Sequence, residues 1–387
     1  MTTETIEFDP DLAASAGDLL LVRLEQLSMS QSDLAARTGL SGKHINQLIK
    51  HGVAVSPHVA NSLELATGVA AEIWAAVDAA FQARRARAGV DERLEESLEW
   101  LDQFNLGELH ARGVLSSPSR GVQASRDLLK FFGISEPAAW GRVWMAGGAT
   151  FRRSPAFAPS PAATTVWLRT GQRAASEVET RPYSADTLSG MIEELRAMTR
   201  LEIPEAVDQI RASLARAGVA LVLAGEFAGC RASGASWWAG PAKAVVLLSH
   251  RGKREDRLWF TLFHELGHVL KHAKRDTFLD QHPDDASAES EPFSDWTVAS
   301  VESRFLDDGS RAGLLEEEAD RFAADSLIPP RFVPAASAAT SEAEINQIAA
   351  EIGVSAGVVA GRWQFEHGDY ARFTRLRRNV PGSLFDD

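Results

Sequence analysis

Cysteine and long apolar runs are scarce in this chain. Cys230 is the only cysteine among 387 residues, so no internal disulfide can form and nothing implies an oxidising compartment. No apolar run approaches the roughly 18 residues that a membrane-spanning helix needs. The first residues, MTTETIEFDP, are acidic and polar, unlike a secretory signal. We therefore expect a cytoplasmic protein without a membrane partner.

An excess of basic residues is lacking as well. The formal net charge of -13 argues against broad, non-specific binding to nucleic acid or anionic membranes, although it is compatible with a local basic face. The apolar share of 45% is ordinary for a soluble globular protein and is ample for a core. The length favours two or three domains.

The order of the expected elements predicts an α+β fold. Residues 15–90 have the pattern of short helices, and residues 91–200 that of a largely helical linker or platform. Three strand-like runs follow, GVALVLAG, RASGASWWAG and KAVVLLS. Their β-branched and aromatic content fits a small antiparallel or mixed sheet.

Two long helices are expected after these strands. The first runs from about Glu255 to Lys274, and an acidic, loop-like segment at 276–313 separates it from the second, LLEEEADRFAADSLI. The second helix stops at two prolines, which cannot continue it. We therefore divide the chain into the domains 15–90, 91–200, 201–335 and 336–387, the last of them a helical tail.

The stretch HELGHVLKH at 264–272 has the spacing of a metal site. His264 and His268 are four residues apart, so a helix places both rings on one face, about 6 Å apart, where two neutral imidazoles can bind one zinc ion. Glu265 points beside the metal, where it can act as a general base. His272 does not suit the third ligand position, because it lies roughly 12 Å from His264 along a helix.

The third ligand is expected from the second long helix. Glu316 and Asp320 are four residues apart and share one face of that helix. Glu316 can bind the metal, while Asp320 can accept a hydrogen bond from the far N–H of a ligand histidine and fix its tautomer. Glu317 remains the main rival of Glu316.

A surface helix with solvated histidines is the alternative, because H-E-x-x-H fixes only three positions. The flanking residues oppose that alternative, since they make the helix apolar over most of its circumference; they are Leu258, Trp259, Leu262, Phe263, Leu266, Val269 and Leu270. Buried histidine and glutamate need partners, which a metal supplies.

The two motifs together resemble a known family. LWFTLFHELGHVLKH followed by EEEADRFAADSLIP is similar to the ImmA/IrrE family of zinc peptidases over about residues 200–335. The resemblance implies a zincin-like fold, in which a small sheet packs on the H-E-x-x-H helix. It also implies zinc ligands at His264, His268 and Glu316, a base at Glu265, and proteolysis of transcriptional repressors or antitoxins.

Two features of the expected reaction stay open. A second oxyanion donor is usual in such sites, and Tyr183, His250 and Tyr370 are all available for it. An extended substrate is expected to add to a sheet edge by main-chain hydrogen bonds, and we expect RASGASWWAG to be that edge.

The segment MSQSDLAARTGLSGKHINQLI has the pattern of two short helices joined by a tight turn. Ser30 and Asp33 form a capping box, Gly39 makes the turn, and Ile45 and Leu48 hold the second helix. Polar residues are then expected on the outer face, where a major-groove reader needs them: Gln31, Ser41, Lys43, His44, Asn46, Gln47 and Lys50.

A helical hairpin used for dimerisation is the alternative to a DNA reader. Residues 1–90 hold 7 Lys+Arg against 10 Asp+Glu, a net of -3, which favours that alternative. Between residues 31 and 58, however, three basic residues stand against one acidic residue. Residues 15–87 also resemble the antitoxin-type helix-turn-helix of the HigA/XRE class. That resemblance implies a homodimer that binds a double-stranded DNA operator.

Taken together, the motifs predict a DNA-binding regulator with a zinc-dependent endopeptidase domain. Its protein substrate would be a repressor or an antitoxin, in a stress-response or toxin–antitoxin system. The alternative is a transcription factor or antitoxin whose zincin domain is a non-catalytic sensor or binds a cognate toxin.

Overall fold

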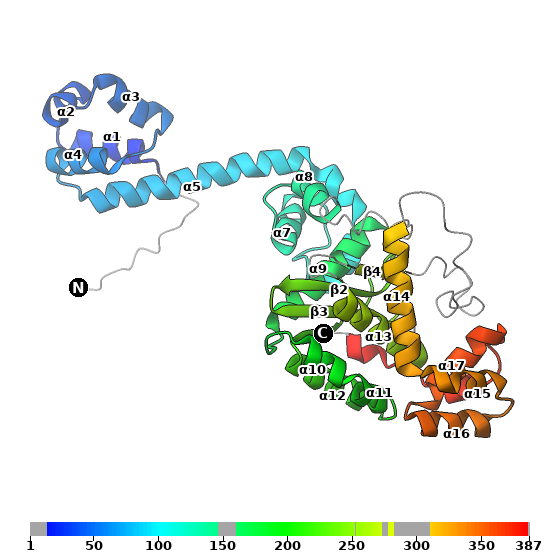
Figure 1. Ribbon diagram of the computed structural model, residues 1–387. Coiled ribbons are helices and arrows are strands. Elements are labelled where there is room, and N and C mark those ends of the chain that lie inside the picture. Colours follow the sequence, from blue (N-terminus) through cyan, green and yellow to red (C-terminus); the bar gives the residue numbers. More distant parts are fainter. Residues whose placement is uncertain (1–13, 146–159, 252, 273–277, 282–309, 386–387) are drawn as a thin grey trace, which may run out of the picture. The chain divides into compact units, whose positions relative to one another are not determined.

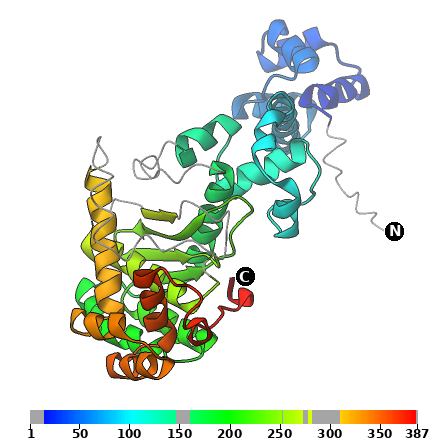
Figure 2. The same ribbon diagram turned by 90° about the vertical axis from the view of Figure 1, so that its right-hand side faces the viewer.

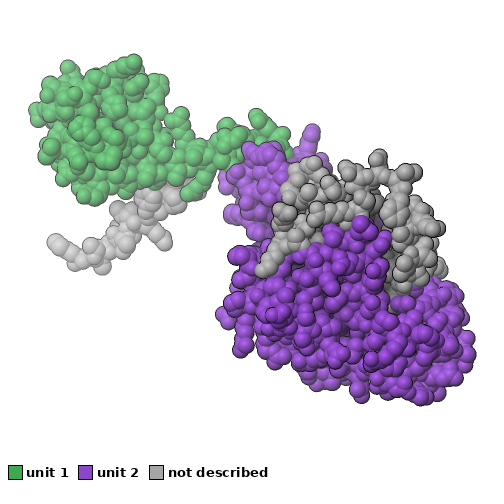
Figure 3. All heavy atoms as spheres, viewed as in Figure 1, with its two compact units in different colours: residues 1–98 green, residues 99–387 purple. Residues whose placement is uncertain are grey.

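The computed structural model describes residues 14–145, 160–251, 253–272, 278–281 and 310–385 (Figure 1, and Figure 2 after a quarter turn). The chain divides into two compact units, Met1–Leu98 and Glu99–Asp387, which Figure 3 shows in different colours. None of the described helices has the length and apolar character needed to cross a lipid bilayer. The predicted α+β fold class is confirmed, because unit 1 is helical and unit 2 combines helices with a small sheet.

Unit 1 is a small helical bundle whose helix ends are encoded locally. Ser15 and Ser30 each accept a hydrogen bond from the backbone three residues on, and an aspartate there bonds back, which completes two capping boxes. Gly39 ends the second helix at φ 72, a left-handed conformation that glycine adopts at little cost. The helices are α1 (Ala16–Gln26), α2 (Gln31–Thr38), α3 (Gly42–His51), α4 (Pro57–Thr67) and α5 (Ala71–Glu96).

The core of unit 1 uses one apolar stripe from each helix. Ile45 and Leu48, which the sequence assigned to holding α3, are 0% and 1% exposed. They pack in one cluster with buried residues of the other helices, namely Leu20, Leu34, Leu63 and Trp74. Burial of these side chains, each worth about 1.5–3 kcal/mol relative to exposure, fixes α2 and α3 as a rigid pair.

Unit 2 begins with short helices that gather aromatic side chains. Rings of Trp100, Phe104, Phe132 and Trp140 lie 5.3–6.5 Å apart between centroids, in tilted or edge contacts. The elements here are η2 (Leu98–Gln103), α6 (Leu106–Ala111), α7 (Val122–Phe132), α8 (Pro137–Trp140) and η3 (Gly141–Met145). They are followed by α9 (Pro161–Glu177), α10 (Ala185–Gly190), α11 (Ile192–Met198) and α12 (Ile203–Arg216).

The sheet of unit 2 is mixed and has the order β1-β3-β2-β4. Its strands are β1 (Val219–Leu223), β2 (Ala232–Gly240), β3 (Lys243–Leu248) and β4 (Phe278–Gln281). β1 pairs with β3 in parallel, whereas β2 is antiparallel to both β3 and β4. The sheet is therefore not purely antiparallel, because the neighbouring strands β1 and β3 run in the same direction.

Helices cover both faces of this sheet, which explains why β1 and β3 have no polar face. Alternate residues of β3, namely Ala244, Val246 and Leu248, join the core that contains α13 (Glu255–Lys271). The other face is covered by α9, whose buried Trp167 donates its indole N–H to the carbonyl of Ala224 at 2.9 Å. The sheet is therefore packed between α13 on one face and α9 on the other.

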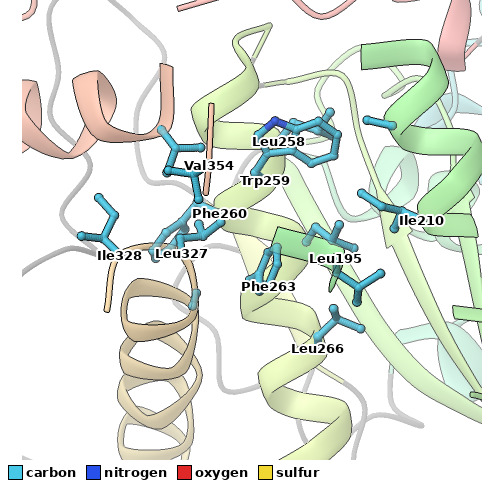
Figure 4. Close-up of a cluster of buried hydrophobic side chains, with 14 of the residues drawn as sticks. Leu195, Ile210, Leu258, Trp259, Phe260, Phe263, Leu266, Leu327, Ile328 and Val354 are labelled. Atoms are coloured by element: carbon cyan, nitrogen blue, oxygen red, sulfur yellow. The ribbon is translucent and has the colours of Figure 1, made fainter. Parts of the chain in front are cut away.

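The core around α13 draws on most of unit 2. Figure 4 shows Trp259, Phe260 and Phe263 of α13 among residues of other elements, including Leu195 of α11 and Ile210 of α12. The chain ends in α14 (Ser310–Leu327), η6 (Pro330–Phe332), α15 (Val333–Ala338), α16 (Glu342–Ile352), α17 (Ala356–His367), η7 (Thr374–Leu376) and η8 (Gly382–Phe385). Of these elements, α14 makes the most extensive contacts with α13.

The tail fastens the N-terminal end of α13 through two buried ion pairs. Arg378 donates from Nε to Glu255 Oε2 at 2.9 Å, and Arg377 donates from Nε to Asp256 Oδ1 at 2.8 Å. Glu255 and Asp256 are 0% and 5% exposed. Because an unpaired buried carboxylate is costly, these pairs hold the register of the helix that carries His264.

Three expected element boundaries are wrong. The first long helix ends at Lys271 rather than near Lys274, with His272 as its C-cap. The segment 276–313 was expected to be a loop throughout, but residues 278–281 form the edge strand β4 and α14 begins at Ser310. Residues 282–309 of that segment lie outside the described part of the chain.

Candidate metal centre

The centre of α13 brings three polar side chains into a dry environment. His264, Glu265 and His268 are 4%, 0% and 2% exposed, and apolar residues surround them on the same helix. Buried polar groups are normally hydrogen-bonded or bound to a metal. A surface helix with solvated histidines is therefore excluded.

Three donor atoms converge between α13 and α14. His264 Nε2 and His268 Nε2 lie 2.9 Å apart, and each lies 3.2 Å from Glu316 Oε2. A tetrahedral zinc ion about 2 Å from each ligand sets its donor atoms roughly 3.3 Å apart, so this triangle has the size that zinc needs. Two imidazole nitrogens and one carboxylate oxygen are also ordinary zinc donors.

The charges of the cluster favour a cation. Burial alone would lower the pKa of His264, but the carboxylates of Asp320 and Glu316 outweigh it and raise that pKa well above its usual value. Burial lowers the pKa of His268 to about 4. Burial would raise the pKa of Glu316, but hydrogen bonds from both histidines lower it instead. The cluster therefore favours a bound positive charge, which a proton or a divalent metal ion can supply.

The far nitrogen of each histidine also has a partner. His264 Nδ1 lies 2.7 Å from Asp320 Oδ1, the contact expected from the spacing of Glu316 and Asp320. His268 Nδ1 lies 2.8 Å from Nδ1 of His272. Both rings are therefore fixed with their Nε2 atoms toward Glu316.

Glu265 lies on the sheet side of the cluster. The backbone of β2 passes close to it, since a Cβ atom added at Gly234 would lie 2.5 Å from Glu265 Oε1. Gly234 therefore leaves room for the carboxylate, and this close approach is a feature that the sequence analysis missed.

The expected substrate edge is wrong in part. β2, which contains most of RASGASWWAG, is paired with β3 on one side and with β4 on the other over residues 232–236. A substrate strand cannot pair with those residues while β4 is in place. The expectation did not include the short strand β4 beside β2.

Two of the three proposed oxyanion donors have other contacts. Tyr183 donates its hydroxyl to the carbonyl of Val269 at 3.2 Å, and His250 Nε2 lies 2.9 Å from the carbonyl of Val380. Tyr370 lies in the tail, where burial raises its pKa. These contacts give no reason to choose any of the three as a second oxyanion donor.

Of the predicted DNA-facing residues of unit 1, Gln31 begins α2, Ser41 precedes α3, and the other five lie in α3. Gln31, Ser41, Lys43 and Lys50 are exposed, whereas the side chains of the other three, His44, Asn46 and Gln47, are half-buried. The hydroxyl of Ser41 accepts a hydrogen bond from the backbone N–H of His44 at 3.2 Å, so it serves as the N-cap of α3.

A family comparison covers part of unit 2. Residues 222–301 match the model of the IrrE N-terminal-like domain, Peptidase_M78, whose members are zinc-dependent peptidases. The match includes β2, β3 and the whole of α13 but ends before Glu316 and Asp320. No curated protein matches the chain. Residues 222–301 are thus similar to the IrrE N-terminal-like domain of the Peptidase_M78 family.

Proposed function

We propose that unit 2 is a zinc-dependent endopeptidase, with His264, His268 and Glu316 as metal ligands and Glu265 as general base. The observation that carries the proposal is the convergence of three donor atoms within 3.2 Å of one another beside a fully buried carboxylate. The match of residues 222–301 to a peptidase family supports it.

Each residue then has a distinct task. A zinc ion at this site would act as a Lewis acid toward a water molecule and the scissile carbonyl group. Glu265 accepts the proton from that water and passes it to the leaving amine, as a positioned carboxylate can. Asp320 holds the Nδ1 proton of His264, which leaves the Nε2 lone pair for the metal. Glu316 completes the ligand set from α14.

We further propose that unit 1 binds double-stranded DNA and that the chain acts as a regulator on an operator, as a homodimer. The support is the packed α2–α3 pair, which leaves Lys43 and Lys50 of α3 and Gln31 at the start of α2 exposed to solvent. A repressor or an antitoxin is the proposed substrate, since those are the substrates implied by the family resemblance.

The decisive experiment compares the wild-type chain with Glu265→Gln in cells under stress. The variant should keep zinc and lose the base, so both proteins are first checked for bound metal. New protein N-termini that appear only with the wild type would support the peptidase and name its substrate.

Identical N-termini with both proteins, at equal zinc content, would reject the peptidase. The remaining reading would then be a regulator in which the zinc site is structural, senses a ligand or contributes to toxin binding.

A further inference from the structure

The third histidine of HELGHVLKH lies beside the metal cluster without being part of it. His272 is the residue at which α13 ends, and its backbone is extended (φ -109, ψ 166). Its side chain is 1% exposed, and its ring centroid lies 4.9 Å from that of His268. The two Nδ1 atoms are 2.8 Å apart, which is a hydrogen-bond distance.

A hydrogen bond between two imidazole nitrogens fixes where both protons are. His268 directs Nε2 at His264 and Glu316, so as a neutral metal ligand it carries its proton on Nδ1. That Nδ1–H must donate to His272, and Nδ1 of His272 must therefore accept with a lone pair. A neutral His272 that accepts at Nδ1 carries its own proton on Nε2.

A carboxylate of α14 lies near this Nε2 atom. Glu318 Oε2 is 3.5 Å from His272 Nε2, which is a long polar contact rather than a short hydrogen bond. The resulting order is Glu318, His272, His268 and then the metal position. His264, by contrast, has its carboxylate partner Asp320 in direct contact at 2.7 Å.

We propose that His272 is a positioning residue, which accepts the Nδ1 proton of His268 and so holds that ring with Nε2 toward the metal. The inference rests on the zinc site proposed above and extends it to a residue that is not a ligand. Partners of this kind are worth about 10- to 100-fold in metal affinity where they have been removed from other sites.

The test measures zinc affinity of the full chain by competition with a chromophoric chelator. His272→Leu removes the acceptor, and His272→Asn restores one, because the amide oxygen of asparagine occupies nearly the place of Nδ1. His58→Leu applies the same chemical change to an exposed histidine of unit 1 and controls for zinc bound by surface histidines.

The inference expects His272→Leu to bind zinc about 10-fold or more weakly than wild type. His272→Asn and His58→Leu should remain within about 3-fold, and all variants should keep the thermal midpoint of the metal-free wild type. Equal affinity of His272→Leu and wild type would overturn the inference and leave the zinc site standing. If the wild type itself binds no zinc, both the proposed function and the inference about His272 fail.

A second measurement needs no substitution. If His272→Leu does not fold, this measurement still tests whether His272 accepts the Nδ1 proton of His268. Nitrogen chemical shifts of the zinc-loaded wild type, labelled with ¹⁵N only at its 10 histidines, report the tautomer of each ring. The inference requires His268 protonated at Nδ1 and His272 protonated at Nε2 alone. A His272 ring with a proton on Nδ1 would contradict it.

Discussion

The two units treat polar side chains in opposite ways. Unit 2 buries charged and ionisable groups along α13, from Glu255 through Glu265 to His268, and provides a partner for most of them. Unit 1 leaves Lys43 and Lys50 exposed to water, and Asp78 is the only ionisable side chain that is buried among its described residues.

This difference decides how much a structure says about function. A buried carboxylate or imidazole needs a specific partner, so the partners that are present narrow the chemistry to a few options. An exposed lysine is satisfied by water and is compatible with many roles. The metal site is therefore supported by the distances between buried side chains, whereas DNA binding is supported by the arrangement of two helices.

The largest expected effect is on zinc affinity, and it distinguishes the adjacent residues Glu316 and Glu317. Glu316→Ala should weaken zinc binding by more than about 100-fold, because a ligand contributes more than a residue that only orients a ligand, which is worth about 10- to 100-fold. Glu317→Ala should leave the affinity within about 3-fold, since it is Glu316 that reaches both histidines. Chelator competition measures both values, and a loss confined to Glu317→Ala would reassign the ligand.

The next effect concerns buried and exposed ion pairs within unit 2. Arg378→Ala leaves Glu255, whose side chain is 1% exposed, without its guanidinium, and should lower the free energy of unfolding by about 3–5 kcal/mol. Arg120→Ala breaks a pair with Asp102 whose side chains are 47% and 62% exposed, and should cost about 0–1 kcal/mol. Chemical denaturation of both variants checks the contrast, which equal losses would refute.

Two glycines of β2 provide a smaller and more local test. Gly234→Ala places a methyl group 2.5 Å from Glu265 Oε1, so it should cost about 1–3 kcal/mol of stability and reduce cleavage while zinc stays bound. Gly240→Ala meets no atom within 4 Å and should resemble wild type in both assays. If Gly234→Ala kept full stability and activity, the close approach of β2 to Glu265 would have no functional weight.

A buried thiol gives a reactivity test of the same contrast. Burial raises the pKa of Cys230 to about 11, so almost no thiolate is present between pH 7 and 9. The folded chain should react slowly with iodoacetamide over that range, and the unfolded chain should react readily. Equal rates in the two states would show that Cys230 is accessible.

Much of this architecture could be predicted from local patterns. The capping residues Ser15, Ser30 and Ser41 sit at helix starts, and the i,i+4 spacing of Glu316 and Asp320 put both beside His264. In each case the relevant residues are neighbours on one helix or adjoin one turn. Short-range geometry was sufficient there.

The features that could not be predicted depend on contacts between distant segments. Arg378 reaches Glu255 over 123 positions of sequence, and the basic end RFTRLRR carried no sign of that partner. The pairing of β4 with β2 is equally non-local. The contact of His272 with His268 is local, because the two residues are four positions apart on one helix face, and the spacing that excludes His272 as a ligand is compatible with it.

The smallest change in stability is expected on the exposed face of unit 1, where the effect on DNA binding should be clearest. Lys43→Ala and Lys50→Ala should each leave the unfolding free energy within about 0.5 kcal/mol. If these lysines contact phosphates, each substitution should also lower the slope of log affinity against log salt concentration by about 1. Fluorescence anisotropy with DNA from the promoter of the chain's own gene measures the slope, and Lys130→Ala, which changes an exposed lysine of unit 2, is the control.

A wild-type chain that binds no DNA at low salt would favour the dimerisation hairpin. Binding that all three variants lose equally would place the DNA contact elsewhere on the surface. Loss confined to Lys43→Ala and Lys50→Ala would show that water-exposed side chains, which the fold does not constrain, carry the function of unit 1.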